Sequence, residues 1–228
     1  MKHYGLIGQS LSHSWSADFF AKKFECESID ADYRLLEVPV LTADAVDGLN
    51  NKLDGYNVTI PYKERIIPFL RALEPVAAAI GAVNIVKNGV GYNSDWIGFK
   101  TALREACEQM PANALVLGQG GAAKAIAYAL NEMGIANEMI SARGLDNLDV
   151  NPFQLIVNAT PLGMYPDVKT FPNIDYESLT PKHVLFDCVY NPAQTEFLRL
   201  GKVKGAIVIG GLRMLEEQAE ASWRLWNN

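Results

Sequence analysis

Residues 55–64 carry polar and basic side chains whose spacing could place them in one small site. The segment predicts a short strand in which Asn57 and Thr59, two residues apart, point to the same side, and Pro61 ends the strand just before Lys63. Neutral hydrogen-bonding groups can recognise hydroxyls, and a lysine can both bind an anionic group and carry a proton. The segment therefore suits a hydroxylated, carboxylated small molecule, although Asn and Thr before a proline are also typical of a plain turn.

The composition indicates a folded, acidic protein. A chain of 228 residues suits one large domain or two modest ones, and a hydrophobic content of 49% is ample for a packed core. The formal net charge of -6 argues against a nucleic-acid surface or an anionic membrane as partner. Because no apolar run is long enough for a signal peptide or a membrane span, we expect a soluble cytoplasmic protein.

Cysteine and histidine residues are few and widely scattered. They are Cys26, Cys107, Cys188, His3, His13 and His183. Because no C-x-x-C pattern occurs, neither a disulfide framework nor a zinc site is indicated, and we expect no metal.

The N-terminal third adds polar residues to the region of Lys63. A strand at residues 4–8 leads into a serine-rich turn before a helix expected at residues 17–24. Ser14 and Ser16 could cap that helix or present their hydroxyls to a cleft at the carboxyl edge of the sheet. The next expected elements are a strand at 33–38, a helix at 42–50 and mostly helical structure at 63–80.

The dipeptide Asn88-Gly89 lies between two apolar-alternating segments, 83–86 and 90–93. Asn-Gly between such segments predicts a β-hairpin. The arms of this hairpin carry Asn84 and Asn93, and Asp95 follows at its exit.

Residues 114–125 read as a buried strand, a glycine turn (Gly118, Gln119, Gly120 and Gly121) and a small-residue helix starting at Ala122. Glycines let the backbone approach a pyrophosphate, and the N–H groups at the start of the helix supply partial positive charge. The segment favours a dinucleotide-binding turn over a strand-to-helix packing turn without a ligand.

The end of the next strand, residues 137–141, should meet the adenosine ribose. An acid there favours NAD and a basic residue favours the 2′-phosphate of NADP, so Arg143 favours NADP unless it is only a solvated surface residue. About ten residues separate Arg143 from the next strand at 155–158, too few for a further helix and strand. We therefore expect the nucleotide-binding part of the chain to lack one of the helix-and-strand crossover connections of a full dinucleotide-binding domain.

The remaining elements are a strand at 184–190, a short helix at 195–203, a strand at 206–209 and a helix at 212–226. The last helix has apolar residues on one face, with Met214 and Gln218 beside it.

In their order and spacing these motifs resemble the shikimate dehydrogenase family over nearly the whole chain. The motifs are Gly8 with His13-Ser14-Trp15-Ser16, Asn57-Val58-Thr59-Ile60-Pro61-Tyr62-Lys63, Gly81-Ala82-Val83-Asn84, Gly91-Tyr92-Asn93-Ser94-Asp95, Gly118-Gln119-Gly120-Gly121, Asn158-Ala159-Thr160-Pro161-Leu162-Gly163-Met164, Asp187 with Tyr190-Asn191-Pro192, and Gly211-Leu212-Arg213-Met214-Leu215 up to Gln218. The resemblance implies an α/β fold of two domains. An N-terminal α/β substrate domain would comprise residues 1–96 plus 206–228, with the C-terminal helix returning to it, and a Rossmann-like NADP-binding domain would comprise residues 97–205.

The resemblance also implies roles for individual residues. Lys63 and Asp95 would be catalytic. The substrate-binding residues would be Ser14, Ser16, Asn57, Thr59, Lys63, Asn84, Asp95, Tyr190 and Gln218. The cofactor-binding residues would be Gly118, Gln119, Gly120, Gly121, Ala122, Arg143, Asn158, Thr160, Met164, Val189, Gly211 and Met214. Ala17, Phe19, Gln119 and the segment Ser141-Ala142-Arg143 depart from the family pattern.

The implied reaction is the reversible NADP(H)-dependent reduction of 3-dehydroshikimate to shikimate, in chorismate and aromatic amino-acid biosynthesis. Lys63 could stabilise and protonate the oxygen that gains charge as hydride arrives, with Asp95 holding the ammonium group in place. We expect a monomer or homodimer with no nucleic-acid or membrane partner. Two alternatives stay open: a quinate/shikimate dehydrogenase using NAD, and a non-catalytic nucleotide-sensing regulator, against which the presence of both Lys63 and Asp95 argues.

Overall fold

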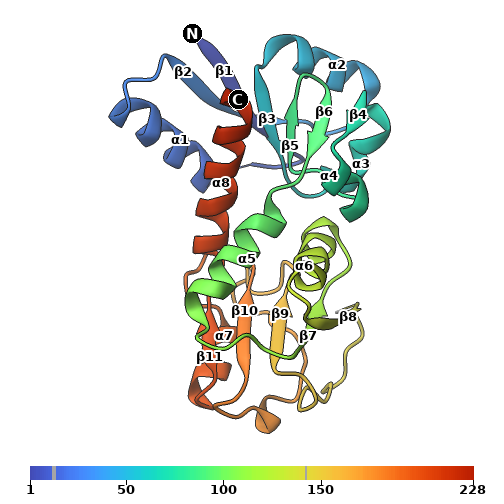
Figure 1. Ribbon diagram of the computed structural model, residues 1–228, viewed down its shortest axis with the longest axis vertical. Helices are drawn as coiled ribbons and strands as arrows, with labels where there is room; N and C mark the ends of the chain where they lie inside the picture. Colours follow the sequence, from blue (N-terminus) through green and yellow to red (C-terminus); the bar gives the residue numbers. More distant parts are fainter. Residues whose placement is uncertain (12–13, 142) are drawn as a thin grey trace. The chain divides into compact units, whose positions relative to one another are not determined.

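The computed structural model describes residues 1–11, 14–141 and 143–228, so His13 of the serine turn and Ala142 lie outside the described residues. The chain forms two compact units. The first comprises Met1–Ser94 and Ala219–Asn228, and the second comprises Asp95–Gln218. Each unit is built around one β-sheet (Figure 1).

The first unit contains a six-stranded mixed sheet in the order β2-β1-β3-β5-β6-β4. Its strands are β1 (Lys2–Gly8), β2 (Ala31–Glu37), β3 (Gly55–Val58), β4 (Ala72–Leu73), β5 (Ile85–Lys87) and β6 (Val90–Tyr92). β1 pairs in parallel with β2 and β3, whereas β5 is antiparallel to β3. The carboxyl ends of β1 and β3 therefore lie at the same edge of the sheet, as the polar residues following them require.

Both faces of this sheet are covered. The helical segments of the unit are α1 (Trp15–Cys26), α2 (Ala43–Lys52), α3 (Tyr62–Arg65), the 3-10 turn η1 (Ile67–Phe69), α4 (Pro75–Ile80) and the end of α8 (Leu212–Asn227). One apolar cluster includes Ile7 and Tyr56, and the other includes Tyr4, Phe20 and Trp226. Tyr4 and Ile7 are three residues apart on β1 and so point to opposite faces, which is why this strand is apolar on both sides.

The hairpin forms as Asn88-Gly89 predicts. Asn88 has φ 51° and Gly89 has φ 72°, the left-handed values that a two-residue hairpin turn of this kind needs.

Residues 63–80 differ from the mostly helical structure that we expected. The helix α3 ends at Arg65, and the extended strand β4 separates η1 from α4. Pro68 has no N–H to extend a helix. The following backbone instead pairs with the hairpin, because Arg71 N donates to Gly89 O (2.9 Å) and Glu74 N donates to Gly91 O (2.9 Å).

The second unit contains a parallel five-stranded sheet in the order β11-β10-β9-β7-β8. Its strands are β7 (Asn113–Leu117), β8 (Ala136–Ile140), β9 (Leu155–Asn158), β10 (Val184–Asp187) and β11 (Ile207–Ile209). Its helical segments are α5 (Asp95–Ala106), α6 (Gly121–Glu132), η2 (Tyr176–Ser178), α7 (Glu196–Val203) and the first part of α8. Apolar clusters cover both faces, as is typical of a parallel sheet.

The expected loss of a crossover is confirmed. β8 and β9 pair with opposite edges of β7, and the described residues between β8 and β9 contain no helix.

The C-terminal segment is divided between the units. β11 pairs with β10 in the second sheet, whereas Ala219–Asn228 belongs to the first unit. The unit boundaries thus differ from the expected 1–96 plus 206–228 and 97–205, because β11 continues the parallel sheet. In the part of the chain that the structure describes, no helix has both the length and the apolar character needed to span a membrane.

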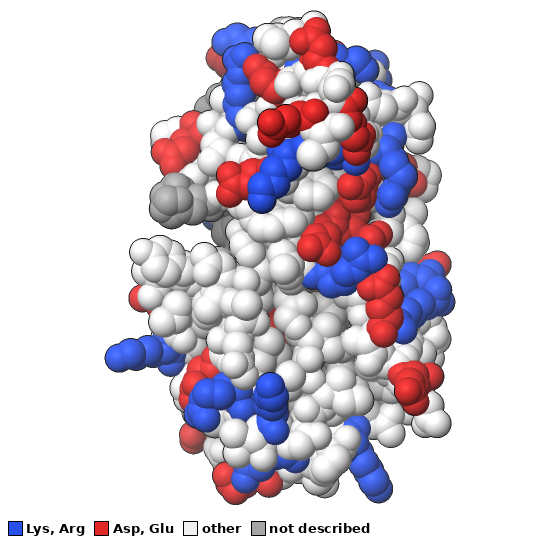
Figure 2. Space-filling model, turned by 90° about the vertical axis from the view of Figure 1, so that its left-hand side faces the viewer, with Lys and Arg blue, Asp and Glu red and all other residues white. Residues whose placement is uncertain are grey.

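Acidic and basic side chains are interspersed on the face drawn in Figure 2. The ion pairs of the two units include Lys23 with Glu220 (3.1 Å) in the first unit, where Lys23 is largely buried, and Arg213 with Glu105 (2.6 Å) in the second, where both side chains are exposed.

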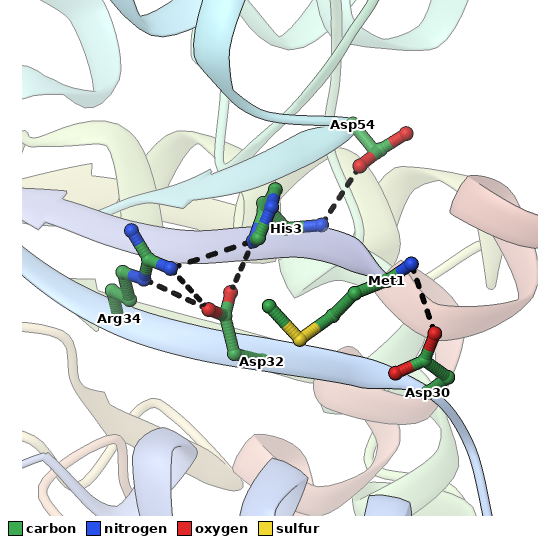
Figure 3. A network of polar contacts seen from close by, with 6 residues as sticks. All are labelled: Met1, His3, Asp30, Asp32, Arg34 and Asp54. Carbon is green, nitrogen blue, oxygen red and sulfur yellow. Dashed lines mark hydrogen bonds and ion pairs between the residues drawn. The ribbon is translucent and has the colours of Figure 1, made fainter.

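A polar network ties the start of β1 to β2 (Figure 3). His3 Nδ1 lies 3.0 Å from Asp32 Oδ1, and Arg34 Nε donates to Asp32 Oδ2 (2.9 Å). Burial raises the pKa of Asp32, but the hydrogen bonds from His3 and Arg34 outweigh this, so the net pKa is lowered. The network lies at the amino ends of the strands, at the opposite end of the sheet from the candidate site residues.

Candidate active site

Thr59 and the serine turn follow the carboxyl ends of β3 and β1. Thr59 N donates to Ile7 O (3.0 Å), so the pairing of the two strands continues one residue beyond β3. Gly8 packs against Thr59, since a Cβ added at Gly8 would lie 2.9 Å from Thr59 Cγ2. Ser14 is the N-cap residue of α1 but makes no side-chain capping bond, and Ser16 is buried. Ser14 therefore occupies the N-cap position that the sequence indicated, but its hydroxyl does not cap the helix.

Asn57 is buried, and both the nitrogen and the oxygen of its side-chain amide form hydrogen bonds within the protein. Its Nδ2 donates to Asn84 O (3.1 Å) and to Ser222 Oγ (2.8 Å), and its Oδ1 accepts from the Tyr33 hydroxyl (2.8 Å). Burial raises the pKa of Tyr33, an effect that a hydrogen bond from Ser16 partly offsets. The structure thus brings together two of the expected residues, Ser16 and Asn57, through Tyr33.

Asn84 fixes the backbone directly before Asp95. The Asn84 side chain accepts from Ser94 N (2.7 Å) and donates to Ser94 Oγ (3.1 Å). Asn93 donates to Ala82 O (2.9 Å), which closes the same turn. Asp95 is 3% exposed and is the first residue of α5, in the second unit.

Lys63 lies on α3 in the first unit. Val83 N donates to Lys63 O (2.7 Å), so the backbone that carries this lysine is tied to the residue before Asn84. Its side chain is half-buried. The pairing of Lys63 with Asp95 stays a prediction.

The glycine turn has the geometry that a phosphate-binding turn needs. Gly118 has φ 130°, and a Cβ there would lie 3.0 Å from Ala159 O, so a side chain is disfavoured on both grounds. A Cβ at Gly120 would meet nothing within 4 Å, and Gln119 is exposed. α6 begins at Gly121 without a side-chain cap, so its first N–H groups are not used by a capping residue. These features fit a dinucleotide phosphate.

A second turn follows β9. Asn158 Nδ2 donates to Leu162 O (3.1 Å), and Thr160 Oγ1 donates to Asn158 Oδ1 (2.6 Å). Asn158 is completely buried, whereas Met164, at the end of the same turn, is 39% exposed.

Asp187, at the end of β10, holds several of these segments together. Its carboxylate accepts from Asn158 Nδ2 (3.0 Å), Val189 N (2.9 Å) and Thr195 Oγ1 (2.5 Å). Burial raises the pKa of this carboxyl to about 6, against the lowering effect of hydrogen bonds from Thr195, Val189 and Asn158. Asp187 thereby orients the backbone just before Tyr190.

The other expected cofactor-side residues differ in exposure. Met214 is 7% exposed and packs in the core of the second unit. A Cβ at Gly211 would lie 2.4 Å from Cys188 O, so the start of α8 approaches the loop after β10 closely. Arg143 is exposed and its N donates to Ser141 Oγ (3.2 Å).

Tyr190 and Gln218 are both half-buried in the second unit. Tyr190 lines a shallow pocket together with Gly210 and Leu212. Among the described residues, no group of three or more His, Cys, Asp or Glu side chains could hold a metal ion.

Sequence reasoning missed Tyr33, Ser222 and Asp187 as parts of these networks. A buried strand ending in an acid was a signal for Asp187. Ser222 lies one helical turn before the apolar Trp226, which indicated that it faces the same neighbour.

The chain is similar to known proteins over nearly its whole length. Residues 6–86 match the family model described as the shikimate dehydrogenase substrate binding domain. The NADP(+) shikimate dehydrogenase of Desulforamulus reducens is 35% identical over 97% of this chain and 88% of that protein, and the one of Pyrococcus furiosus is 37% identical over 99% and 90%. A solved structure of shikimate 5-dehydrogenase from Thermus thermophilus in complex with NADP(H) and shikimate has a TM-score of 0.90 at 31% identity, covering 99% of this chain and 93% of that one. On these similarities, together with the two α/β units, the chain belongs to the shikimate dehydrogenase family.

Proposed function

We propose that this protein is an NADP(H)-dependent shikimate dehydrogenase, an oxidoreductase that reversibly reduces 3-dehydroshikimate to shikimate. The observation that carries the proposal is its similarity, at 35–37% identity over 97–99% of the chain, to relatives with that activity in their names. The matching structure with both NADP(H) and shikimate bound supports the same substrate and cofactor. The step belongs to chorismate and aromatic amino-acid biosynthesis.

Shikimate would be held by polar side chains. The expected residues are Ser14, Ser16, Asn57, Thr59, Lys63, Asn84, Asp95, Tyr190 and Gln218. Hydroxyl and amide groups suit the recognition of a polyhydroxylated acid, because each can donate or accept a hydrogen bond.

Lys63 and Asp95 would carry the proton chemistry. When NADPH is bound, it supplies the hydride that reduces the ring ketone. The Lys63 ammonium would stabilise the negative charge that develops on the ketone oxygen and donate a proton to it. In the oxidation direction the Lys63 amine would accept that proton, and the Asp95 carboxylate would orient the ammonium throughout. General acid–base catalysis of this kind accelerates a reaction by about 10²–10⁴-fold.

The second unit would hold the cofactor. Backbone N–H groups of the glycine turn and of the start of α6 would bind the pyrophosphate, with Ala122 in the first turn of that helix. The Arg143 guanidinium would pair with the 2′-phosphate. The turn from Asn158 through Thr160 to Met164, with Val189, Gly211 and Met214, would shape the other side of the cofactor site.

A comparison of two acids and two cofactors tests this proposal. The purified protein is assayed with shikimate and with quinate, each with NADP and with NAD. We expect the highest kcat/KM for shikimate with NADP. Preference for NAD, or equal use of quinate, would support the quinate/shikimate alternative, and cofactor binding without any turnover would support the regulator. The cytoplasmic location and the monomeric or homodimeric state stay predictions.

A further inference from the structure

Three buried polar side chains of the second unit, Asn158, Asp187 and Thr195, form one hydrogen-bonded cluster. Asn158 ends β9, Asp187 ends β10 and Thr195 is the N-cap residue of α7. Asp187 Oδ1 accepts from Asn158 Nδ2 (3.0 Å), and Asp187 Oδ2 accepts from Thr195 Oγ1 (2.5 Å). None of the three is more than 1% exposed, so their polar atoms are satisfied within the protein. We call these three residues the carboxylate cluster.

The carboxylate cluster fixes the turn that follows β9. Asn158 Nδ2 also donates to Leu162 O (3.1 Å), and Asn158 Oδ1 accepts from Thr160 N (3.2 Å). Gly163, further along the same turn, packs on Thr195, because a Cβ added at Gly163 would lie 3.3 Å from Thr195 Cβ. The turn is therefore held at its start by Asn158 and near its end by Thr195.

The same cluster fixes the loop that follows β10. Val189 N donates to Asp187 Oδ1 (2.9 Å), and Val189 O accepts from Gly211 N (3.2 Å), just before α8. Between these two bonds, Cys188 N donates to Asn158 O (2.9 Å). Asp187 thus lies where the segments that follow β9, β10 and β11 meet.

The topology of the sheet indicates which half of a dinucleotide these segments would face. A dinucleotide crosses the carboxyl edge of such a sheet where the strand order reverses, which here is between β7 and β9. β8, which leads to Arg143, lies on one side of β7, and β9, β10 and β11 lie on the other. Since we propose that Arg143 pairs with the 2′-phosphate on the adenosine, the segments after β9, β10 and β11 would face the nicotinamide half.

Asp187 and Thr195 are buried, so they can act on the cofactor only through the backbone that they hold. Burial raises the pKa of Asp187 to about 6, so at pH 8 the group is a carboxylate that accepts from all three donors. Loss of the Thr195 hydroxyl would leave Asp187 Oδ2 buried without that donor and would loosen the contact with Gly163. A turn that is correctly placed for only part of the time binds its ligand more weakly in proportion.

We propose that Asp187 and Thr195 are positioning residues that hold the segments after β9 and β10 in place for the nicotinamide half of the cofactor and so set its affinity. This inference rests on the proposed function, and within it on the cofactor. It implies that a change at either residue weakens the binding of the nicotinamide half and leaves the binding of the adenosine half unchanged.

The test compares two substitutions at one position. Thr195→Val keeps the shape of the side chain and removes the hydroxyl, whereas Thr195→Ser keeps the hydroxyl. Thr180→Val is the matched control: its hydroxyl accepts from Lys182 N (3.3 Å), but Thr180 precedes β10 and so lies toward the amino end of that strand. Dissociation constants are measured by calorimetry at pH 8 for NADP and for adenosine 2′,5′-bisphosphate, which carries the 2′-phosphate but no nicotinamide.

We expect Thr195→Val to raise the Kd for NADP about tenfold, because the binding arrangement of the turns would be populated about a tenth as often. Its Kd for adenosine 2′,5′-bisphosphate should stay within about twofold of that of the unmodified protein. Thr195→Ser and Thr180→Val should match the unmodified protein for both ligands.

A second variant covers the case in which Thr195→Val does not fold. Asp187→Asn leaves Thr195 in place as the cap of α7, but its amide nitrogen cannot accept from the Thr195 hydroxyl. The amide oxygen still accepts from Val189 N, so we expect a smaller change, a rise of about threefold in the Kd for NADP alone.

The outcomes separate this inference from the proposed function. If the unmodified protein binds no NADP, both fail; if it binds NADP but does not oxidise shikimate, the proposed function fails while the comparison of dissociation constants still decides this inference. If Thr195→Val and Thr195→Ser bind NADP equally well, this inference alone is refuted. An equal loss of affinity for NADP and for adenosine 2′,5′-bisphosphate in Thr195→Val would also refute it, because it would show a general loss of structure.

Discussion

Asp187 should make the stability of the second unit fall as the pH rises from 4 to 6. Its carboxyl is fully buried, and burial raises its pKa from the ordinary 3.8 to about 6. A folded-state pKa above the unfolded one means that the folded state binds the proton more tightly. The stability contributed by this group is thus fully present below pH 4 and is lost as the pH rises through 6.

The raised pKa of Asp187 should change the free energy of unfolding by an amount that can be measured. A difference of about 2 pKa units corresponds to about 3 kcal/mol of unfolding free energy between pH 3 and pH 8, and about 1 kcal/mol of it falls between pH 5 and pH 7. Asp187→Asn removes the titration while its amide oxygen still accepts from Val189 and Asn158. The free energy of unfolding of the variant, relative to the unmodified protein, should therefore rise by about 1 kcal/mol from pH 5 to pH 7, or about 3 °C in Tm.

The assay is thermal and urea unfolding at both pH values, with Asp146→Asn as a control that makes the same chemical change at an exposed position. The control should show no pH-dependent difference of this size. A relative stability of Asp187→Asn that is the same at pH 5 and pH 7 would refute the reasoning. If the free energy of unfolding of Asp187→Asn, relative to the unmodified protein, instead falls as the pH rises, the hydrogen bonds from Thr195, Val189 and Asn158 lower the pKa of Asp187 by more than burial raises it.

Three further predictions concern packing and the cofactor. Gly55→Ala places a Cβ 2.3 Å from the Trp226 ring and should destabilise the first unit by about 1–3 kcal/mol in urea unfolding, whereas Gly48→Ala, where no atom lies within 4 Å, should not. Gly118→Ala meets Ala159 O at 3.0 Å with φ 130° and should weaken NADP binding in fluorescence titration; unchanged affinity would contradict the role of the turn. Arg143→Gln should raise the KM for NADP about tenfold and leave the KM for NAD unchanged, since only NADP carries the 2′-phosphate; an equal change in both would contradict that pairing.

The sequence predicted most elements because local signals agree with the tertiary structure. Asn88-Gly89 formed the expected hairpin, the glycine turn lies between β7 and α6, and the short spacing after Arg143 indicated the missing crossover. The prediction of mostly helical structure at residues 63–80 was wrong. β4 forms through hydrogen bonds to the hairpin backbone at Gly89 and Gly91, and the helix propensity of the segment itself contains no information about these distant partners.

The candidate site was predictable by residue type but not by hydrogen-bond partner. Asn57 stood out by its spacing from Thr59 and Lys63, and Asn84 by its place on an arm of the predicted hairpin. That Asn57 bonds to Ser222, a residue 165 positions later, depends on the return of α8 to the first unit. Asp187 was named in the sequence only as part of a motif shared with the family, and its burial and three hydrogen-bond donors became known from the structure.

The most direct test of the central claim is the kcat for shikimate oxidation with NADP in the unmodified protein and in Lys63→Ala, with NADP binding measured on the same samples. Lys52→Ala, a change at an exposed lysine of the first unit, serves as the control. We predict that Lys63→Ala lowers kcat by about 10²–10⁴-fold while NADP affinity and the activity of the control stay unchanged. Undiminished turnover by Lys63→Ala would contradict the assignment of Lys63 as the residue that transfers the proton.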